Sequence, residues 1–154
     1  MDIGEIITPP QIRPALKASS KKQTLQELAR FSAQWVEQDE RAIFDILLER
    51  ERLGTTGVGR GVAIPHGKLA ALDRLYGFFA RLETPVPFDA IDEQPVDLIF
   101  LLLAPESAGA DHLKALAQVS RMLRDQAVCT KLRGTDSSEA IYALLTETAA
   151  SEAA

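Results

Sequence analysis

One stretch of the chain is almost entirely apolar. Residues 96–103 read Val-Asp-Leu-Ile-Phe-Leu-Leu-Leu, and they are bounded by Pro95 and Pro105. The stretch is far shorter than the roughly 20 residues that a membrane-spanning helix needs. A strand with one face in water alternates apolar and polar residues, whereas this stretch is interrupted only by Asp97. It therefore predicts a central strand whose two faces are both covered.

The rest of the chain supplies helices and further strands. Apolar residues recur at helical spacing in several segments. The predicted helices cover residues 20–37, Asp39 to Gly54, a segment opened by residues 108–111, a helical turn at 126–133, and a last helix that starts at Ser137 or Ser138 and ends near Leu145. Strands are predicted at residues 12–16 and 75–82, the second broken by Thr84-Pro85-Val86-Pro87. This pattern indicates a single α/β (α+β) domain with a mixed β-sheet flanked by helices.

A glycine-rich segment, Gly57–Lys68, carries one of the two histidines of the chain. Residues 62–64 alternate as in a strand with one buried face. Pro65 cannot donate a hydrogen bond, so strand pairing is predicted to stop there. Gly67 has no Cβ, which would let a ligand or a partner's backbone come close. We therefore expect His66 at a strand edge, held on a stiff turn and open to one side.

The second histidine, His112, falls in the first turn of the helix predicted after the apolar strand. The start of a helix has unpaired N–H groups and the positive end of the helix dipole, so it favours an anion. Two histidines placed in this way suit a phosphoryl group, one carrying it and the other donating hydrogen bonds to its oxygens. Arg50 or Arg60 would supply the cation through its planar guanidinium group.

Other interpretations of these residues stay open at this point. Each histidine and arginine alone is compatible with a solvated side chain that has no chemical role. A zinc site made by His66, His112 and Cys129 is possible, although no two of these ligands are closely spaced in the sequence. A cysteine–histidine protease is less favoured, because no residue that activates a thiol flanks Cys129.

Composition narrows the classes of function. The net charge of −5 disfavours nonspecific binding of nucleic acid or of an anionic membrane. A single cysteine agrees with a reducing compartment, and the first residues lack the basic and apolar regions of a signal peptide. We therefore expect a cytoplasmic protein that is not inserted in a membrane.

Two runs of residues resemble a known family. Gly54–Lys68, which ends in Ile-Pro-His-Gly-Lys, is similar to the active-site signature of mannitol/fructose-type (type 2) EIIA components of the bacterial phosphotransferase system. Residues 82–100 resemble the nitrogen-regulatory branch of that family. The resemblance covers roughly residues 3–146, which would form one EIIA type 2 domain with the mannitol-type EIIA fold, and it leaves 147–154 as a frayed C-terminal tail.

The resemblance also implies roles for individual residues. His66 would be the phosphorylated nucleophile, attacking through Nε2, while His112 and Arg50 would stabilise the phosphoryl group; Arg60 is given no catalytic role. No cofactor and no metal are implied. The implied donor is an HPr-like phosphocarrier (NPr), and the implied function is regulation of target proteins, such as potassium-transport or sensor-kinase components, according to phosphorylation state. The alternative is a sugar-specific EIIA that relays phosphate to an EIIB component.

Overall fold

Strand β6 (Val96–Pro105) forms the centre of the molecule, as its composition predicts. Its side chains alternate between two separate apolar cores, and those from Leu98 to Ala104 are fully buried. Leu98, Phe100 and Leu102 face one core, whereas Ile99 and Leu101 face the other. The computed structural model describes residues 2–153, with side chains described through residue 147.

The sheet is mixed and has six strands. Along it the order is β1 (Ile12–Leu16), β5 (Tyr76–Val86), β6, β3 (Val62–Ala63) and β2 (Gly57–Gly59), while β4 (His66–Leu69) pairs with the later part of β6. Strand β6 is antiparallel to β5 and parallel to both β3 and β4. The two parallel partners place the segment around His66 directly beside the buried centre of the sheet.

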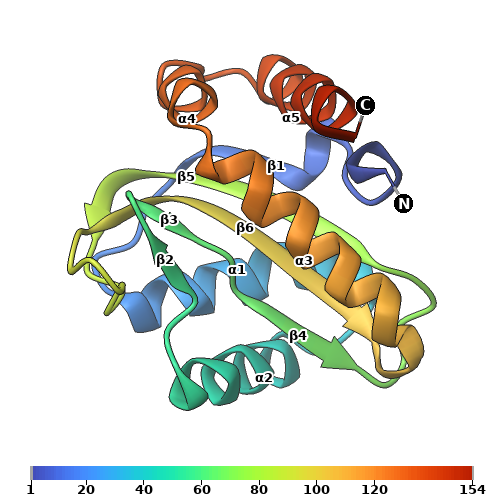
Figure 1. Cartoon of the computed structure of the whole chain (residues 1–154). Coiled ribbons are helices and arrows are strands. Elements are labelled where there is room, and N and C mark those ends of the chain that lie inside the picture. The colour runs from blue at the N-terminus through green and yellow to red at the C-terminus, as the bar shows by residue number, and fades with distance from the viewer. Residues whose placement is uncertain (1, 154) are drawn as a thin grey trace.

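Two helices cover one face of the sheet: α1 (Lys21–Val36) and α2 (Glu40–Leu53) (Figure 1). The hydroxyl of Ser20 accepts a hydrogen bond from the N–H of Gln23, as expected of an N-cap. Helix α2 ends at Gly54, which confirms the predicted stop. Its apolar residues pack on the core that includes Ile99 and Leu101.

The opposite face is covered by α3 (Gly109–Arg124), α4 (Gln126–Arg133) and α5 (Ser138–Ala153) (Figure 1). Short 3₁₀ turns at Ile3–Glu5, Pro9–Gln11 and Glu106–Ala108 complete the fold. The backbone of α5 is helical to Ala153, so regular structure continues beyond Thr146. The predicted frayed tail at 147–154 and the predicted domain limits at residues 3–146 stay predictions.

The structure corrects three expectations about strands. Pairing does not stop at Pro65: its carbonyl accepts the N–H of Leu102 at 3.0 Å, and β4 begins at the next residue. Proline lacks only the donor, so its carbonyl can still pair. Residues 62–64 are all buried, so the segment has no exposed face. Strand β5 continues through Pro85 to Val86, which pairs with Val96 after a register shift.

Candidate active site

His66 is the first residue of β4, and its ring is fixed by the backbone just before it. Nδ1 lies 2.9 Å from the carbonyl oxygen of Ile64. A carbonyl only accepts hydrogen bonds, so Nδ1 carries the proton and Nε2 is left with a free electron pair. The ring is half-buried. The geometry therefore exposes Nε2, and not Nδ1, for chemistry.

Arg50 reaches His66 from the last turn of α2. Its Nε–H donates to Nε2 of His66 at 3.1 Å, and its Nη1 donates to the carbonyl of Gly54 at 2.9 Å. The second bond anchors the guanidinium group to the end of its own helix. A cation is thus held against the nitrogen that has the free electron pair.

His112 faces His66 from the first turn of α3. The ring centroids are 5.6 Å apart and the ring planes meet at 71°. His112 is only 6% exposed, and its buried Nε2 has no hydrogen-bond partner among the described residues. A buried nitrogen without a partner is uncommon and calls for an explanation. The structure thus brings together the three residues that the sequence singled out: His66, His112 and Arg50.

Both imidazoles are kept neutral by their surroundings. Burial lowers the pKa of His66 below its ordinary value of 6.5, opposed by the Ile64 carbonyl and helped by the charge of Arg50. Burial also lowers the pKa of His112; repulsion from His66, when that ring is protonated, and from the charge of Lys68 acts in the same direction. A neutral His66 at pH 7 is what a nucleophile requires.

The sequence interpretation missed Glu51, the residue that follows Arg50, whose carboxylate is buried. It accepts hydrogen bonds from the N–H of Thr56 at 3.0 Å and from the Thr56 hydroxyl, and it forms an ion pair with Lys21 at 3.0 Å. One signal in the sequence indicates it: Ile43, Leu47 and Glu51 follow one another at intervals of four. The charge therefore falls on the buried stripe of the helix.

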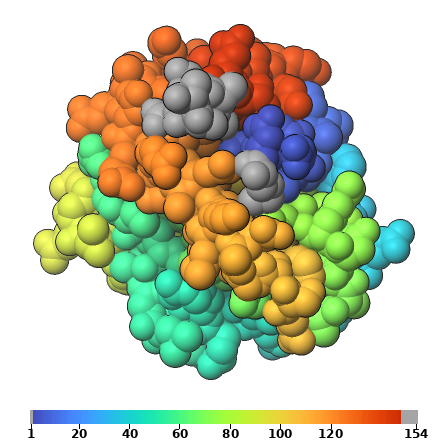
Figure 2. Space-filling model, turned by 45° about the vertical axis from the view of Figure 1, so that its right-hand side comes forward, coloured from blue at the N-terminus to red at the C-terminus, as the bar shows by residue number. Residues whose placement is uncertain are grey.

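The site lies in a cavity of about 360 Å³ between α2, β4 and α3. Its wall includes the exposed side chain of Leu53. The lining residues are Ile46, Glu49, Arg50, Leu53, His66, Gly67, Lys68 and His112. In the space-filling view, the green atoms of the segment around residues 50–65 lie next to the orange atoms of α3 on one face (Figure 2).

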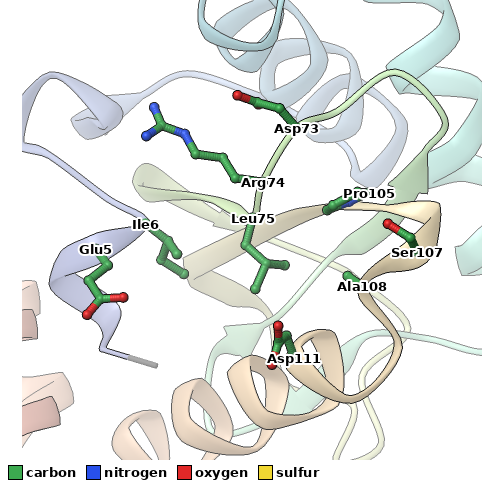
Figure 3. Close-up of a pocket in the computed structure, with 9 residues that line it drawn as sticks. All are labelled: Glu5, Ile6, Asp73, Arg74, Leu75, Pro105, Ser107, Ala108 and Asp111. Carbon is green, nitrogen blue, oxygen red and sulfur yellow. The ribbon is translucent and has the colours of Figure 1, made fainter.

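A larger cavity, of about 510 Å³, holds neither histidine. It lies between the N-terminal 3₁₀ turn, the loop before β5 and the start of α3, and Figure 3 shows the charged groups that line it. The first turn of α3 gives Asp111 to this cavity and His112 to the smaller one. The reactive groups are therefore gathered in the smaller cavity.

The structure gives Gly67 a second reason beside the one that the sequence suggested, which stays a prediction. A Cβ at this position would lie well inside 3.0 Å of Cγ2 of Ile46 on α2. Real Cβ contacts are essentially never so short. The glycine thus lets α2 pack closely on β4, and it is this packing that brings Arg50 to His66.

The other candidates lie elsewhere. Arg60 donates to the Arg124 carbonyl at 3.2 Å and accepts from Arg133 through its own carbonyl, so it joins the β2–β3 turn to α3 and α4. Asp97 forms an ion pair with Arg133 at 2.8 Å. Cys129 is buried in the core under α3 and donates to the Leu123 carbonyl. Among the described residues, no group of three potential ligands could hold a metal ion.

Comparison with known proteins identifies the family. Residues 5–148 match the family described as "Phosphoenolpyruvate-dependent sugar phosphotransferase system, EIIA 2". A nitrogen regulatory protein of Bradyrhizobium diazoefficiens is 59% identical over 145 residues, which is 94% of this chain and 95% of that protein. The crystal structure of nitrogen regulatory protein IIA-Ntr from Neisseria meningitidis superposes with a TM-score of 0.90 at 38% identity, covering 94% and 99% of the two chains.

A more distant structure shows the same fold. The crystal structure of IIA mannitol from Escherichia coli superposes with a TM-score of 0.75 at 21% identity, covering 90% of this chain and 98% of the other. Within the described residues, no helix is both long enough and apolar enough to cross a bilayer. The chain belongs to the EIIA type 2 family of the phosphoenolpyruvate-dependent phosphotransferase system, and within that family it is similar to the nitrogen regulatory proteins.

Proposed function

We propose that the protein is a phosphohistidine carrier in which Nε2 of His66 receives a phosphoryl group from an HPr-like phosphocarrier (NPr). One observation carries the proposal: the Ile64 carbonyl holds the proton on Nδ1, which leaves the Nε2 electron pair beside a cation and an unpaired histidine nitrogen. Neutral imidazole is the form of histidine that attacks phosphorus.

The transfer step follows from this geometry. The Nε2 electron pair of His66 forms a bond to phosphorus while the N–P bond of the donor breaks, and the electron pair of the broken bond returns to the donor nitrogen. Positive charge develops on the His66 ring, and the Ile64 carbonyl stabilises it through Nδ1–H. No proton has to leave the site during the transfer.

Arg50 and His112 have separate roles in the proposal. The Nε–H of Arg50 occupies the attacking electron pair in the free protein, so it must turn to the phosphoryl oxygens as phosphorus approaches. Its bond to Gly54 keeps the guanidinium group close meanwhile. In its Nε2-protonated form, His112 donates to a phosphoryl oxygen. Charge spread over such oxygens is stabilised by positioned donors, which are the main source of catalysis in phosphoryl transfer.

The phosphorylated protein is proposed to regulate other proteins in the cytoplasm. The similarity to nitrogen regulatory proteins favours this over relay of phosphate to a sugar-specific EIIB component. A phosphoryl group adds about −1.5 to −2 of charge, which changes an interface that includes the cavity around His66. Potassium-transport and sensor-kinase components are the targets that we would test first.

The proposal is tested by incubating the protein with phosphoenolpyruvate, enzyme I and the HPr-like carrier, and by following intact mass. We expect one acid-labile phosphoryl adduct on the wild type and none on His66→Ala. Absence of an adduct on the wild type, with a donor that is itself phosphorylated, would reject the carrier function. Rapid onward transfer to an EIIB component would instead favour the sugar relay.

A further inference from the structure

The side chain of Glu51 is almost completely buried, with 3% of its surface exposed, and each of its two oxygens accepts from a donor. Both donors of Thr56, its N–H and its hydroxyl, point to the carboxylate, and Lys21 from the start of α1 balances the charge. Replacing a buried ion pair by apolar residues is often neutral or stabilising. The Lys21–Glu51 pair is therefore weak evidence that Glu51 serves to stabilise the fold, and a role in positioning other groups has to be considered.

The carboxylate is the first link of a chain of hydrogen bonds that ends on His66. Glu51 holds Thr56; the Thr56 carbonyl accepts the N–H of Ile64 at 3.0 Å; and the Ile64 carbonyl accepts Nδ1–H of His66 at 2.9 Å. Each link holds the residue that makes the next one: Thr56 is held at its N–H and hydroxyl and accepts at its carbonyl, and Ile64 donates at its N–H and accepts at its carbonyl. The position of the Ile64 carbonyl, which selects the tautomer of His66, therefore depends on where Glu51 holds Thr56.

Glu51 is also tied to Arg50. The two residues are neighbours in the last turn of α2, and the Glu51 carbonyl accepts the N–H of Gly54 at 3.2 Å. The carbonyl of Gly54 in turn anchors Arg50. The main-chain carbonyl of Glu51 thus closes the turn that holds Arg50 in place. Its side chain begins the series of hydrogen bonds that orients His66.

A further contact comes from the loop between β5 and β6. Lys21 lies 4.9 Å from the Phe88 ring centroid and 3.5 Å from Asp89. Asp89 is mostly exposed, so this second ion pair contributes little. Glu51 is thus the partner that gives Lys21 its structural role.

We propose that the side chain of Glu51 is a positioning group for phosphoryl transfer: through Thr56 and Ile64 it fixes the tautomer and orientation of His66, next to the turn at Gly54 that its main-chain carbonyl closes. The inference rests on the proposed function of His66. Glu51 itself does not touch the phosphoryl group in this proposal. What matters is the length of its side chain and its hydrogen-bond acceptors, more than its charge.

Two conservative variants separate these properties. Glu51→Asp keeps the charge beside Lys21 but is one methylene too short to hold Thr56, whereas Glu51→Gln keeps the length and an acceptor oxygen but removes the charge. Asp45→Asn, at an exposed ion pair on the same helix, is the matched control. The tautomer is read from long-range ¹H–¹⁵N correlation spectra of ¹⁵N-histidine-labelled protein at pH 7.5, and the rate of phosphoryl transfer is measured at saturating HPr-like carrier.

In wild type, Asp45→Asn and Glu51→Gln, we expect the Nδ1–H tautomer of His66. Glu51→Gln should keep its transfer rate within about threefold of wild type, well short of the effect of misplaced reacting groups, because glutamine keeps the length and an acceptor oxygen for Thr56. Glu51→Asp should show a mixture of tautomers and a rate lower by about 10–100-fold, because small misplacements of reacting groups have effects of this size. The apparent KM for the carrier should be unchanged, since Glu51 is buried and does not line the cavity around His66.

The opposite pattern overturns the proposal: a wild-type rate and tautomer in Glu51→Asp, or loss of both in Glu51→Gln, would make Glu51 an electrostatic or purely structural residue. A rate lost in both variants with the tautomer kept would overturn it as well. If the wild type takes no phosphoryl group, the proposed function fails. The tautomer contrast between the variants, which needs no phosphate, still decides the positioning role.

Discussion

The close approach of α2 to β4 at Gly67 makes one substitution especially informative. In Gly67→Ala the new methyl group would overlap Cγ2 of Ile46, a β-branched residue with a stiff rotamer in a helix. Overpacking of this kind costs about 1–3 kcal/mol. The backbone at Gly67 does not have a positive φ, so alanine is otherwise favoured by about 0.4–1 kcal/mol through the unfolded chain.

The midpoints of these ranges leave a net loss of about 1.3 kcal/mol in the free energy of unfolding. For a chain of this length, this corresponds to a fall of about 3–5 °C in Tm. Ile46 and Arg50 are one turn apart on the same face of α2, so the helix shift that relieves the overlap also moves Arg50 from His66. We expect slower phosphoryl transfer from the folded variant.

A double-mutant cycle with Ile46→Ala tests the cause, because that change removes the overlapping methyl group. Gly67→Ala should become neutral or stabilising in the Ile46→Ala background, as measured by urea unfolding. The coupling should favour the double variant by more than about 0.5 kcal/mol, which is the limit of additivity for independent sites. Additive effects of the two changes, or a Gly67→Ala variant as stable as wild type, would refute the packing argument.

Three further predictions concern the site itself. Arg50→Lys keeps a charge but loses the Nε–H and the planar fork, so we expect transfer to slow at least about tenfold, measured as the rate of adduct formation; an unchanged rate would contradict the role of Arg50. His112→Ala should slow transfer by about 10²-fold; because its Nε2 has no hydrogen bond to lose, a fall in the urea midpoint should reflect only the lost packing of its buried ring. Both histidines have a pKa in the folded protein below the 6.5 of the unfolded chain, so the unfolded chain binds more protons and stability should fall as pH drops below about 6.5, then level off below the folded pKa values. Urea unfolding at pH 7.5 and 5.5 checks the sign, and a His66→Gln/His112→Gln double variant should lose less stability between these two pH values.

Periodicity predicted the elements whose burial is extreme. The run in β6 could only be a strand covered on both sides, and the helices around Leu28 and Leu47 show their buried stripes directly in the sequence. In α3 the sequence pointed to a face with Leu113 on it, which is wrong: Leu113 is exposed, and the buried stripe includes Ala115, Val119 and Met122. Proline misled the prediction in two places. A proline carbonyl still accepts a hydrogen bond: at Pro65, between β3 and β4, pairing with β6 continues, and β5 runs through Pro85.

The candidate site was predictable only in part, because its geometry depends on contacts between distant segments. His66, His112 and Arg50 were found from local context and from resemblance, and the structure brings them together. The role of Gly67 in helix packing depends on Ile46, which no local pattern connects to it. Glu51 stood on a buried stripe, but the identity of its partners could come only from the fold.

The central claim is that Nε2 of His66 carries the phosphoryl group. The most direct measurement is to phosphorylate ¹⁵N-histidine-labelled protein through the HPr-like carrier and to identify the modified nitrogen by long-range ¹H–¹⁵N and ³¹P spectra, with peptide mapping to assign the residue. The geometry predicts a single adduct on Nε2 of His66, with the proton still on Nδ1. An adduct on Nδ1, or on His112, would contradict the account.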